Sequence, residues 1–356
     1  MNAFKFGTIV QDEFFTDRQE ELETISNKLD SENHLILISP RRYGKSSLVS
    51  KCLTQLGRPF VWIDLQYVLS VNDFATQLLK GILSVYTYER LKYEIAHFRI
   101  VPTFSTNPLT NDWQVSFQPS SDNSVLLEDV MQLVQKVTTP DKRLIVVFDE
   151  FQEICNIDKH LDRQLRALMQ HQHGLNYIFL GSQESMMEEI FEKKKSPFYH
   201  FGQLIHLDKI PHQEFFHFIF DRLPAVRFKE EIVCDILSFT SCHPYYTQQL
   251  ASEVWEQLVY KQCQEDVVNT SIKTIVQAHD LDYERLWNSL NRTDRSIVLQ
   301  LVRNTNPLQN RSFAASTTFS ALKRLQKNGI IIRQKSAYTI EDPFFCTWLL
   351  QDKNVR

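Results

Sequence analysis

The sequence lacks any run of about 18 consecutive apolar residues, the length that a membrane-spanning helix requires, so we expect no membrane span. Its first residues, Met-Asn-Ala-Phe-Lys-Phe-Gly, contain no basic region followed by an apolar one, and we expect no secretory signal. Six cysteines are scattered without a C-x-x-C pair. Their spacing favours reduced thiols in a cytoplasmic protein over a disulfide framework or a zinc site.

An internal repeat, a low-complexity tract and a strong overall excess of one charge are also absent. The 356 residues have a net charge of −4, which by itself indicates no nucleic-acid partner. Hydrophobic residues make up 43% of the chain and charged residues 23%, a balance typical of soluble globular proteins. A chain of this length predicts two or three domains of roughly 100–200 residues each.

The most informative stretch is an apolar segment followed by a basic turn and a helical pattern. Residues 35–38 predict a strand, and apolar residues at helical spacing begin at Leu48. This strand–loop–helix context is the one that a phosphate-binding loop requires. The residues expected to bind phosphate are Ser39, Pro40, Arg41, Arg42, Tyr43, Gly44, Lys45, Ser46 and Ser47.

Each residue type in this loop suits a phosphate ligand. Gly44 has no Cβ, so the backbone can approach an anion and adopt a positive φ without a steric penalty. Backbone N–H groups at the start of the following helix would point at the phosphate. Lys45 would reach the β- and γ-phosphates, and the Ser46 hydroxyl would bind Mg²⁺. Ser39 stands where the usual pattern has a glycine, so an ordinary strand–turn–helix with a basic turn is the alternative.

Further strand patterns alternate with helical ones, at residues 59–65, 143–150, 176–182 and 204–207. This alternation predicts an α/β fold with parallel strands and right-handed crossovers. Residues 86–125 interrupt the rhythm. Two short strand patterns there predict a hairpin inserted at the sheet edge, at about residues 98–120.

Two carboxylates end the strongest strand pattern of the chain. Asp149 and Glu150 follow the apolar run of residues 144–148. They would emerge at the carboxyl end of a buried strand, where open α/β sheets bind ligands. Asp149 would contact Mg²⁺ through water, and Glu150 would polarise the attacking water. Together with Lys45, these acids predict a nucleotide site.

The chain resembles the archaeal-type P-loop ATPases, a group within the STAND-like relatives of AAA+ proteins that is also widespread in bacteria, and we expect a bacterial member. The stretches that resemble this family are Phe15–Leu22, Ser39–Leu48, Val147–Gln152, Leu180–Ser182, His243–Tyr246 and Asp342–Trp348. The resemblance implies a parallel sheet of order 5-1-4-3-2, a helical lid and a C-terminal winged helix. The implied boundaries are 1–210 for the ATPase domain, 211–285 for the lid and 286–356 for the winged helix.

The resemblance also implies roles for single residues. Asp149 and Ser46 would hold Mg²⁺, Glu150 would be the catalytic base, and ATP would be the nucleotide. Ser182, with Gln183 as a second choice, would be the polar sensor of the γ-phosphate. Pro244 would lie near the adenine, and the residues from Phe14 to Arg18 would close the pocket. His243 is more readily interpreted as a capping or packing residue than as a catalytic acid.

Three positions depart from the family pattern. Ser39 replaces the first loop glycine, Asp17 replaces the glycine before Arg18, and Gln203 follows Gly202 where an arginine is common. The last departure leaves the source of an arginine finger open. Arg163 and Arg166 are alternatives, although arginines on helix surfaces are usually solvated or in ion pairs.

The last 66 residues differ in charge from the rest of the chain. Residues 291–356 contain eleven Lys/Arg and four Asp/Glu, a net charge of +7, against −11 for residues 1–290. Helical patterns at 293–302, 312–316 and 317–328, followed by two strands within 330–340, predict a winged helix. The basic residues expected to contact DNA are Lys323, Arg324, Lys327, Arg333 and Lys335. Packing of this basic face against the acidic remainder, or against a protein partner, is the alternative.

Two hypotheses follow. In the first, the protein is a nucleotide-dependent conformational switch that hydrolyses ATP slowly, because no arginine finger is visible. In the second, it is a DNA-binding winged-helix regulator in which the nucleotide is mainly structural. A protein partner and a homo-oligomer both remain open.

Overall fold

The computed structural model describes residues 2–16, 18–106, 113–117, 122–262, 265–309, 313–334 and 337–352. The chain folds into two compact units. One, which we call the sheet unit, comprises Arg18–Ser39 and Lys45–Leu207. The other, which we call the helical unit, comprises Met1–Asp17, Pro40–Gly44 and Asp208–Arg356.

The sheet unit is built around five parallel strands in the order β2-β5-β6-β1-β7. The strands are β1 (Leu35–Ile38), β2 (Phe60–Asp64), β5 (Ile145–Asp149), β6 (Asn176–Gly181) and β7 (Gln203–His206). Read from β7, with these five strands numbered along the chain, the order is 5-1-4-3-2, so the predicted order is confirmed. The register pairs Asp64 with Asp149 and Ile38 with Gly181, so these strands end level at one edge.

The three inner strands are buried along their whole length. Every residue of β1, β5 and β6 is buried, because each strand has neighbours on both sides and helices on its faces. Aromatic rings fill the core beneath the end of β5. The ring of Phe179 lies 5.9 Å from that of Phe148 and 4.6 Å from that of Phe151. This packing supports the segment that carries Asp149 and Glu150.

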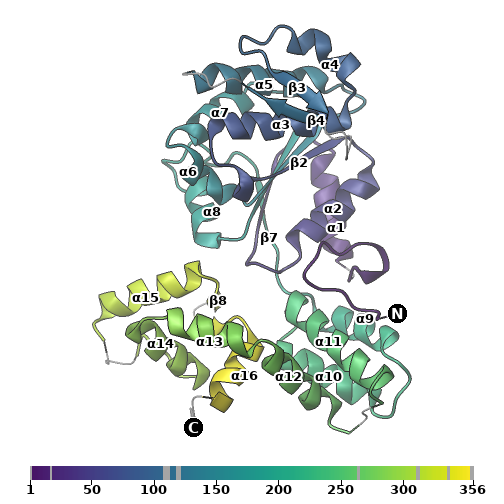
Figure 1. Cartoon of the computed structure of the whole chain (residues 1–356), viewed down its shortest axis with the longest axis vertical. Helices are drawn as coiled ribbons and strands as arrows, with labels where there is room; N and C mark the ends of the chain where they lie inside the picture. The colour runs from purple at the N-terminus through teal and green to yellow at the C-terminus, as the bar shows by residue number, and fades with distance from the viewer. Residues whose placement is uncertain are drawn as a thin grey trace. The chain divides into compact units, whose positions relative to one another are not determined.

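The sheet unit contains eight α-helices among its described residues. They are α1 (Gln19–Leu29), α2 (Lys45–Leu56), α3 (Val71–Val85), α4 (Tyr88–Ile95), α5 (Asn123–Val137), α6 (Ile154–Ile157), α7 (Leu161–Met169) and α8 (Glu184–Phe191), with 3-10 turns η2 (Leu65–Tyr67) and η3 (Phe151–Glu153). Helix α1 packs against α2, and α5 packs against α3 and α7 (Figure 1). Helix α2 begins at Lys45, one turn before the predicted start at Leu48.

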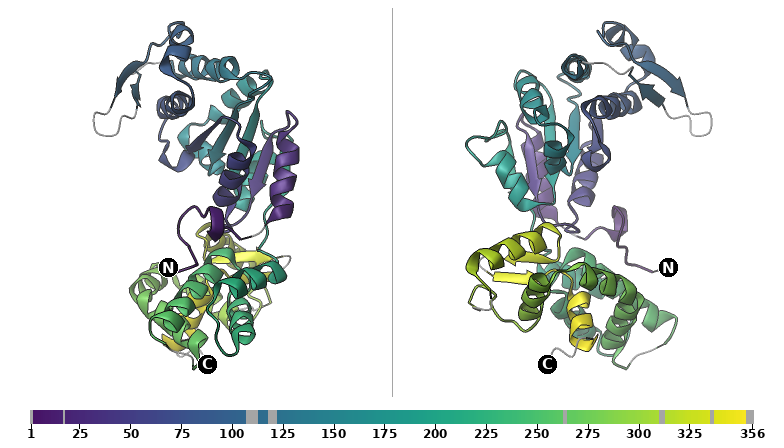
Figure 2. Two further views of the ribbon diagram at one scale, coloured as in Figure 1. Left: turned by 90° about the vertical axis from the view of Figure 1, so that its right-hand side faces the viewer. Right: turned by 60° about the vertical axis from the view of Figure 1, so that its left-hand side comes forward.

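The predicted insertion forms an antiparallel hairpin of β3 (Thr103–Thr106) and β4 (Trp113–Ser116). Among the described residues it forms a two-stranded sheet of its own, separate from the five-stranded sheet. Figure 2 shows the hairpin projecting from the sheet unit. Residues 107–112 and 118–121, which belong to the predicted insertion, lie outside the described residues.

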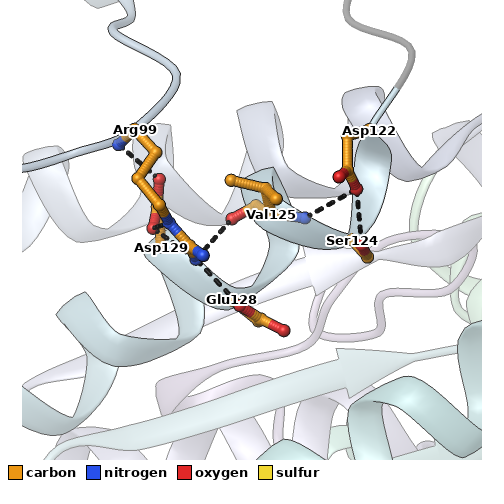
Figure 3. Close-up of polar contacts among 6 residues, drawn as sticks. All are labelled: Arg99, Asp122, Ser124, Val125, Glu128 and Asp129. Atoms are coloured by element: carbon orange, nitrogen blue, oxygen red, sulfur yellow. Dashed lines mark hydrogen bonds and ion pairs between the residues drawn. The ribbon is translucent and has the colours of Figure 1, made fainter.

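A polar network fastens the insertion to α5 (Figure 3). Before β3, Arg99 donates from its backbone N–H and its Nε to Asp129, at 2.7 and 2.9 Å. Its Nη2 also donates to Glu128 at 2.8 Å. After β4, the Asp122 carboxylate accepts from the Val125 N–H at 3.3 Å and caps α5. Both ends of the insertion are thus tied to the same helix.

The helical unit has one continuous apolar core. Its elements are η1 (Asp12–Phe14), α9 (His212–Arg222), α10 (Lys229–Thr240), α11 (Pro244–Val259), α12 (Val267–Ala278), α13 (Asp280–Ser289), α14 (Arg292–Val302), α15 (Ala315–Lys327), β8 (Ile331–Gln334), β9 (Ala337–Ile340) and α16 (Pro343–Asp352). The core includes side chains from both predicted C-terminal domains, so the division into a lid and a winged helix stays a prediction. Among the described residues, none of the helices combines the length and apolarity that crossing a membrane requires.

The last predicted helices are partly wrong. No separate helix occupies the described part of residues 312–316, because Phe313 and Ala314 precede one continuous helix, α15. Buried Thr318, Ala321 and Leu325 form one buried stripe along α15. The predicted strand pair is present as the antiparallel hairpin β8–β9.

Candidate functional site

The predicted phosphate loop links β1 to α2. Two of its residues have left-handed backbone conformations, Arg42 with φ 65° and Gly44 with φ 86°. A glycine at position 44 removes the steric cost of this conformation. Arg41 and Arg42 are exposed, whereas Tyr43 is buried. Lys45 is the first residue of α2, so the loop leads directly into a helix N-terminus, the end of a helix that favours anions.

Lys45 lies buried at the end of β1. Its Nζ donates to the backbone oxygen of Ser39 at 2.9 Å and to the Ser39 Oγ at 3.3 Å. The serine in the unusual first position therefore supplies two oxygen acceptors for the ammonium group. These bonds satisfy a buried charge that would otherwise be costly, and phosphate oxygens would compete for the same donors.

Ser46 and Asp149 meet although 103 residues separate them. The Ser46 Oγ donates to Asp149 Oδ2 at 3.0 Å. Burial raises the pKa of Asp149 above its usual value, the Ser46 bond lowers it, and the charges of Glu150 and Asp64 raise it further. A divalent cation would offset this crowding of negative charge.

Ser46 and Asp149 suit Mg²⁺ as part of a site that phosphate and water complete, and do not form a site made of protein ligands alone. A hydroxyl and a carboxylate are hard oxygen ligands of the kind that Mg²⁺ prefers. Within the described residues, no cluster of three or more His, Cys, Asp or Glu side chains is arranged to hold a metal ion. Ser46 and Asp149 therefore match the usual Mg²⁺ arrangement, in which phosphate oxygens and waters complete the coordination.

Glu150 has a left-handed backbone conformation, with φ 51°. Its side chain is fixed by two hydrogen bonds. Its Oε2 accepts from the Ser182 Oγ at 2.5 Å and from the Gln152 Nε2. Ser182 directly follows β6, the neighbour of β5, so adjacent strands bring the predicted base and the predicted sensor together. Gln183, the second choice for the sensor, differs from Ser182 in its contacts. Its buried Oε1 has no hydrogen-bond partner within the described residues.

Two residues at this edge were missed by sequence reasoning. Asp64 ends β2 in register with Asp149. Burial and the charge of Glu150 raise the pKa of Asp64, and a hydrogen bond from the Gln66 N–H lowers it. The sequence did contain a signal for Asp64, because this acid directly follows the apolar residues 59–63, as Asp149 follows its own apolar run. Gln152 is fully buried, and its contact with Glu150 had no signal in spacing or periodicity.

The other predicted residues lie in separate places. Arg18, in the sheet unit, precedes α1 in a left-handed conformation and forms a 2.8 Å ion pair with Glu21. Pro244, in the helical unit, is the first residue of α11. Asp17 lies outside the described residues. The proposed closure of the pocket by Phe14 to Arg18 stays a prediction.

The alternative arginine fingers differ in their surroundings. The Arg166 guanidinium lies 4.4 Å from the centre of the Phe201 ring, and its Nη1 donates to Gln170 at 3.1 Å. Arg163 is exposed. Arg166 therefore has a packing role within its own unit, as expected of a helix-surface arginine.

The predicted DNA-contacting residues divide into two groups. Arg324 donates from Nε and Nη2 to the buried carboxylate of Asp294, at 2.9 and 2.5 Å, and so ties α15 to α14. This bidentate pair links the two helices, and the Arg324 side chain is still 45% exposed, so its contact with DNA stays a prediction. Lys323, Lys327 and Arg333 are exposed, and Lys335 lies outside the described residues.

Comparison with known proteins identifies several relatives. The family of "ATPase domain predominantly from Archaea" matches residues 15–250. An uncharacterized protein of Methanocaldococcus jannaschii is 26% identical over 246 residues, which are 68% of this chain and 46% of that protein. The chain thus spans about half the length of this curated relative.

Two solved structures share the fold. A Walker-type ATPase of Pyrococcus abyssi superposes with a TM-score of 0.68 and 17% identity, over 98% of this chain and 99% of the other. The ORC1 protein of Aeropyrum pernix, solved in complex with DNA, superposes with a TM-score of 0.52 and 10% identity, over 95% of this chain and 93% of the other. At such identities the similarity shows the fold alone.

Proposed function

The chain belongs to the family of ATPase domains found predominantly in archaea, and from this premise we propose that it binds ATP with Mg²⁺ and hydrolyses it. One observation carries the proposal. At one edge of the sheet, Ser46 is bonded to Asp149, and the adjacent Glu150 is bonded to Ser182. A metal-binding pair and a base–sensor pair side by side are what phosphoryl transfer from ATP to water requires.

The residues divide the chemistry among themselves. Lys45 would exchange its Ser39 contacts for phosphate oxygens and offset their charge. Ser46 and Asp149 would hold Mg²⁺, which neutralises charge developing on the phosphates. Glu150 would orient the attacking water and accept its proton. Ser182 would donate its hydroxyl to the γ-phosphate instead of to Glu150.

This exchange at Ser182 gives the hydrolysis a switch-like character. Without nucleotide, Ser182 donates to Glu150 and occupies the carboxylate oxygen that would otherwise bind the attacking water. When ATP binds, the γ-phosphate competes for the hydroxyl and releases the carboxylate. We further propose that the lid (211–285) and the winged helix (286–356) respond to this change, and that a partner supplies the arginine finger.

The test is ATP binding and hydrolysis with Mg²⁺ by the unmodified protein and two variants. Lys45→Ala should lose ATP affinity by about tenfold or more, because it removes a charge-assisted donor. Glu150→Gln should bind ATP and lose turnover by about a hundredfold or more. Lys51→Ala in the same helix and Glu153→Gln in the same turn are matched controls and should behave like the unmodified protein.

Three outcomes are distinguishable. Turnover lost in both variants, with binding kept in Glu150→Gln, supports the roles proposed for Lys45 and Glu150. If the unmodified protein binds ATP tightly but does not hydrolyse it, the proposed hydrolysis by the chain alone is wrong. The protein would then be a switch that needs a partner for hydrolysis. Absence of ATP binding would mean that Ser39 marks a decayed site, and the proposal would fail.

DNA binding is the second candidate function. The observation in its favour is the exposure of Lys323 and Lys327 on α15 and of Arg333 on β8. Replacing both lysines by alanine should abolish a salt-dependent complex with duplex DNA and leave ATP affinity unchanged. Arg324 should be left intact in this experiment, because its loss would break the contact with Asp294. No complex at low salt would exclude this candidate.

A further inference from the structure

Two residues of the phosphate loop contact the start of helix α11 within the helical unit. The Arg42 guanidinium lies 4.5 Å from the centre of the Tyr245 ring and donates to the Tyr246 hydroxyl at 3.4 Å. The Tyr43 ring meets the His243 ring edge to face, with 4.9 Å between the ring centres. The conformation of the loop is therefore linked to the orientation of the His243 imidazole.

The tautomer of His243 follows from its capping bond. Its Nδ1 accepts a hydrogen bond of 3.2 Å from the Tyr245 N–H at the start of α11. A neutral ring that accepts at Nδ1 has its proton on Nε2. That Nε2–H points toward Glu341, whose Oε1 lies 3.7 Å away. Neither atom has a hydrogen-bond partner within the described residues, and the side chains are only 1% and 7% exposed.

Glu341 is fixed at the base of the β8–β9 hairpin. It directly follows β9, and its N–H donates to the Ile330 oxygen, just before β8, at 3.1 Å. The next residue, Asp342, accepts from the Phe344 N–H at 2.8 Å and from the Tyr283 hydroxyl at 3.2 Å, which anchors the start of α16. A shift of the hairpin would therefore move the Glu341 carboxylate relative to His243.

We propose that Glu341 is a positioning residue for the phosphate loop. It orients the His243 ring, that ring holds Tyr43, and the base of the β8–β9 hairpin thereby regulates nucleotide affinity. This inference rests on the proposed ATP-binding function. It means that Glu341, more than 290 residues along the chain from the loop, affects how tightly the loop binds the nucleotide.

The loop is suited to such control because its conformation is costly. Arg42, a residue with a Cβ, has φ 65°, and this conformation persists only where the surroundings hold it. The contacts with Tyr245, Tyr246 and His243 all lie within the helical unit and supply that restraint. Loosening them would leave a loop that must be ordered again when phosphate binds, which weakens affinity.

We call the series of contacts from Glu341 through His243 to Tyr43 the relay. The charges around His243 predict how the relay changes when the pH falls. Burial lowers the pKa of His243, Glu341 partly offsets this effect, and the charges of Lys209 and Arg42 lower the pKa further. The ring is therefore neutral at neutral pH. The neighbouring Cys242 thiol is also uncharged, because burial raises its pKa. Protonation would turn Nδ1 into a donor, break the α11 cap and draw the ring toward Glu341.

The experiment measures Mg²⁺–ATP affinity by calorimetry with the full chain. Glu341→Gln removes the charge at constant size, and His243→Asn keeps a capping side chain while removing the Nε2–H. Each should weaken ATP binding by about five- to tenfold, within the usual range of coupling between sites. Glu253→Gln, which removes a partly buried charge farther along α11, is the matched control and should change affinity less than about twofold.

Two further readouts separate a relay from a merely structural role. The double variant should bind ATP no more weakly than His243→Asn alone, because both changes break one pathway. Because the pKa of His243 lies below 6.5, affinity should hold down to that pH and fall below it by a larger factor in the unmodified protein than in His243→Asn. Glu341→Asp, which keeps the charge but shortens the reach, should weaken binding as well and serves if Glu341→Gln fails to fold.

Unchanged affinity in both Glu341 variants, or additive losses in the double variant, would overturn the relay while ATP binding by the unmodified protein stands. If the unmodified protein binds no ATP, the proposed function itself fails, and the relay with it.

Discussion

The Ser182 hydroxyl donates a 2.5 Å hydrogen bond to Glu150 Oε2, joining residues that follow neighbouring parallel strands. The Gln152 amide donates to the same oxygen. In this arrangement the predicted base is occupied by two donors from its own sheet unit. With both donors in place this oxygen is occupied, so an attacking water must compete with Ser182 and Gln152 for it.

Ser182→Ala separates the two roles of this serine. We expect kcat to fall about tenfold or more with KM nearly unchanged, because a contact made to the γ-phosphate in the transition state is lost. Steady-state hydrolysis of ATP measures both constants. Ser84→Ala, which alters an exposed serine on α3, is the control. An increase in kcat would show instead that Ser182 only restrains Glu150.

Asp149→Asn should stabilise the nucleotide-free protein and remove its response to Mg²⁺–ATP. Since the pKa of Asp149 is raised in the fold, the protonated form is favoured there, and the ionised form at neutral pH is destabilising. An uncharged asparagine removes this destabilisation, so the melting temperature without nucleotide should rise. Thermal unfolding with and without Mg²⁺–ATP checks both effects. A lower melting temperature without nucleotide would contradict the electrostatic argument.

Ser39→Gly restores the residue that phosphate loops usually have at this position. The Lys45 ammonium would keep its 2.9 Å bond to the backbone oxygen and lose only the 3.3 Å bond to Oγ. We expect ATP affinity to change less than about threefold and stability to fall by about 1 kcal/mol or less. Calorimetry and chemical denaturation give the two values. A large loss of affinity would mean that the serine hydroxyl itself is required for binding.

His34 should make the protein less stable in acid. Its Nδ1 accepts from the Tyr177 N–H, and burial, with a further effect of the Arg166 charge, lowers its pKa to about 4. A lowered histidine pKa means that the neutral form stabilises the fold above the unfolded value of about 6.5. This stabilisation, on the order of 2–3 kcal/mol, is lost as the pH falls from 6.5 toward 4.

The measurement for His34 is the denaturation midpoint at pH 7.5 and pH 5.0, compared with His34→Asn. Asparagine keeps an acceptor for the Tyr177 N–H but does not titrate, so its pH dependence should be shallower. Equal slopes in the two proteins would show that other groups determine the acid sensitivity.

Local patterns were sufficient for most of the fold. The apolar run before Asp149 predicted a fully buried central strand, and β5 is buried at every residue. The sheet order came from the resemblance and is confirmed. The error at residues 312–316 has a local cause, since Ala314 and Ala315 do not reveal from sequence whether one helix or two pass through them. The pairing of Arg324 with Asp294 was not visible either, because 30 residues separate the two side chains.

The sequence by itself determined the elements and the residue types of this protein: a loop with Gly44 and Lys45, two acids after an apolar strand, and a basic C-terminal segment. These depend on periodicity and on chemistry within a few residues. Only the tertiary structure decided which groups meet: Ser39 with Lys45, Ser46 with Asp149, Ser182 with Glu150, and His243 with Glu341. The physical reason is that strand register and chain reversal place these atoms within a few ångströms of one another, and no local pattern encodes that distance.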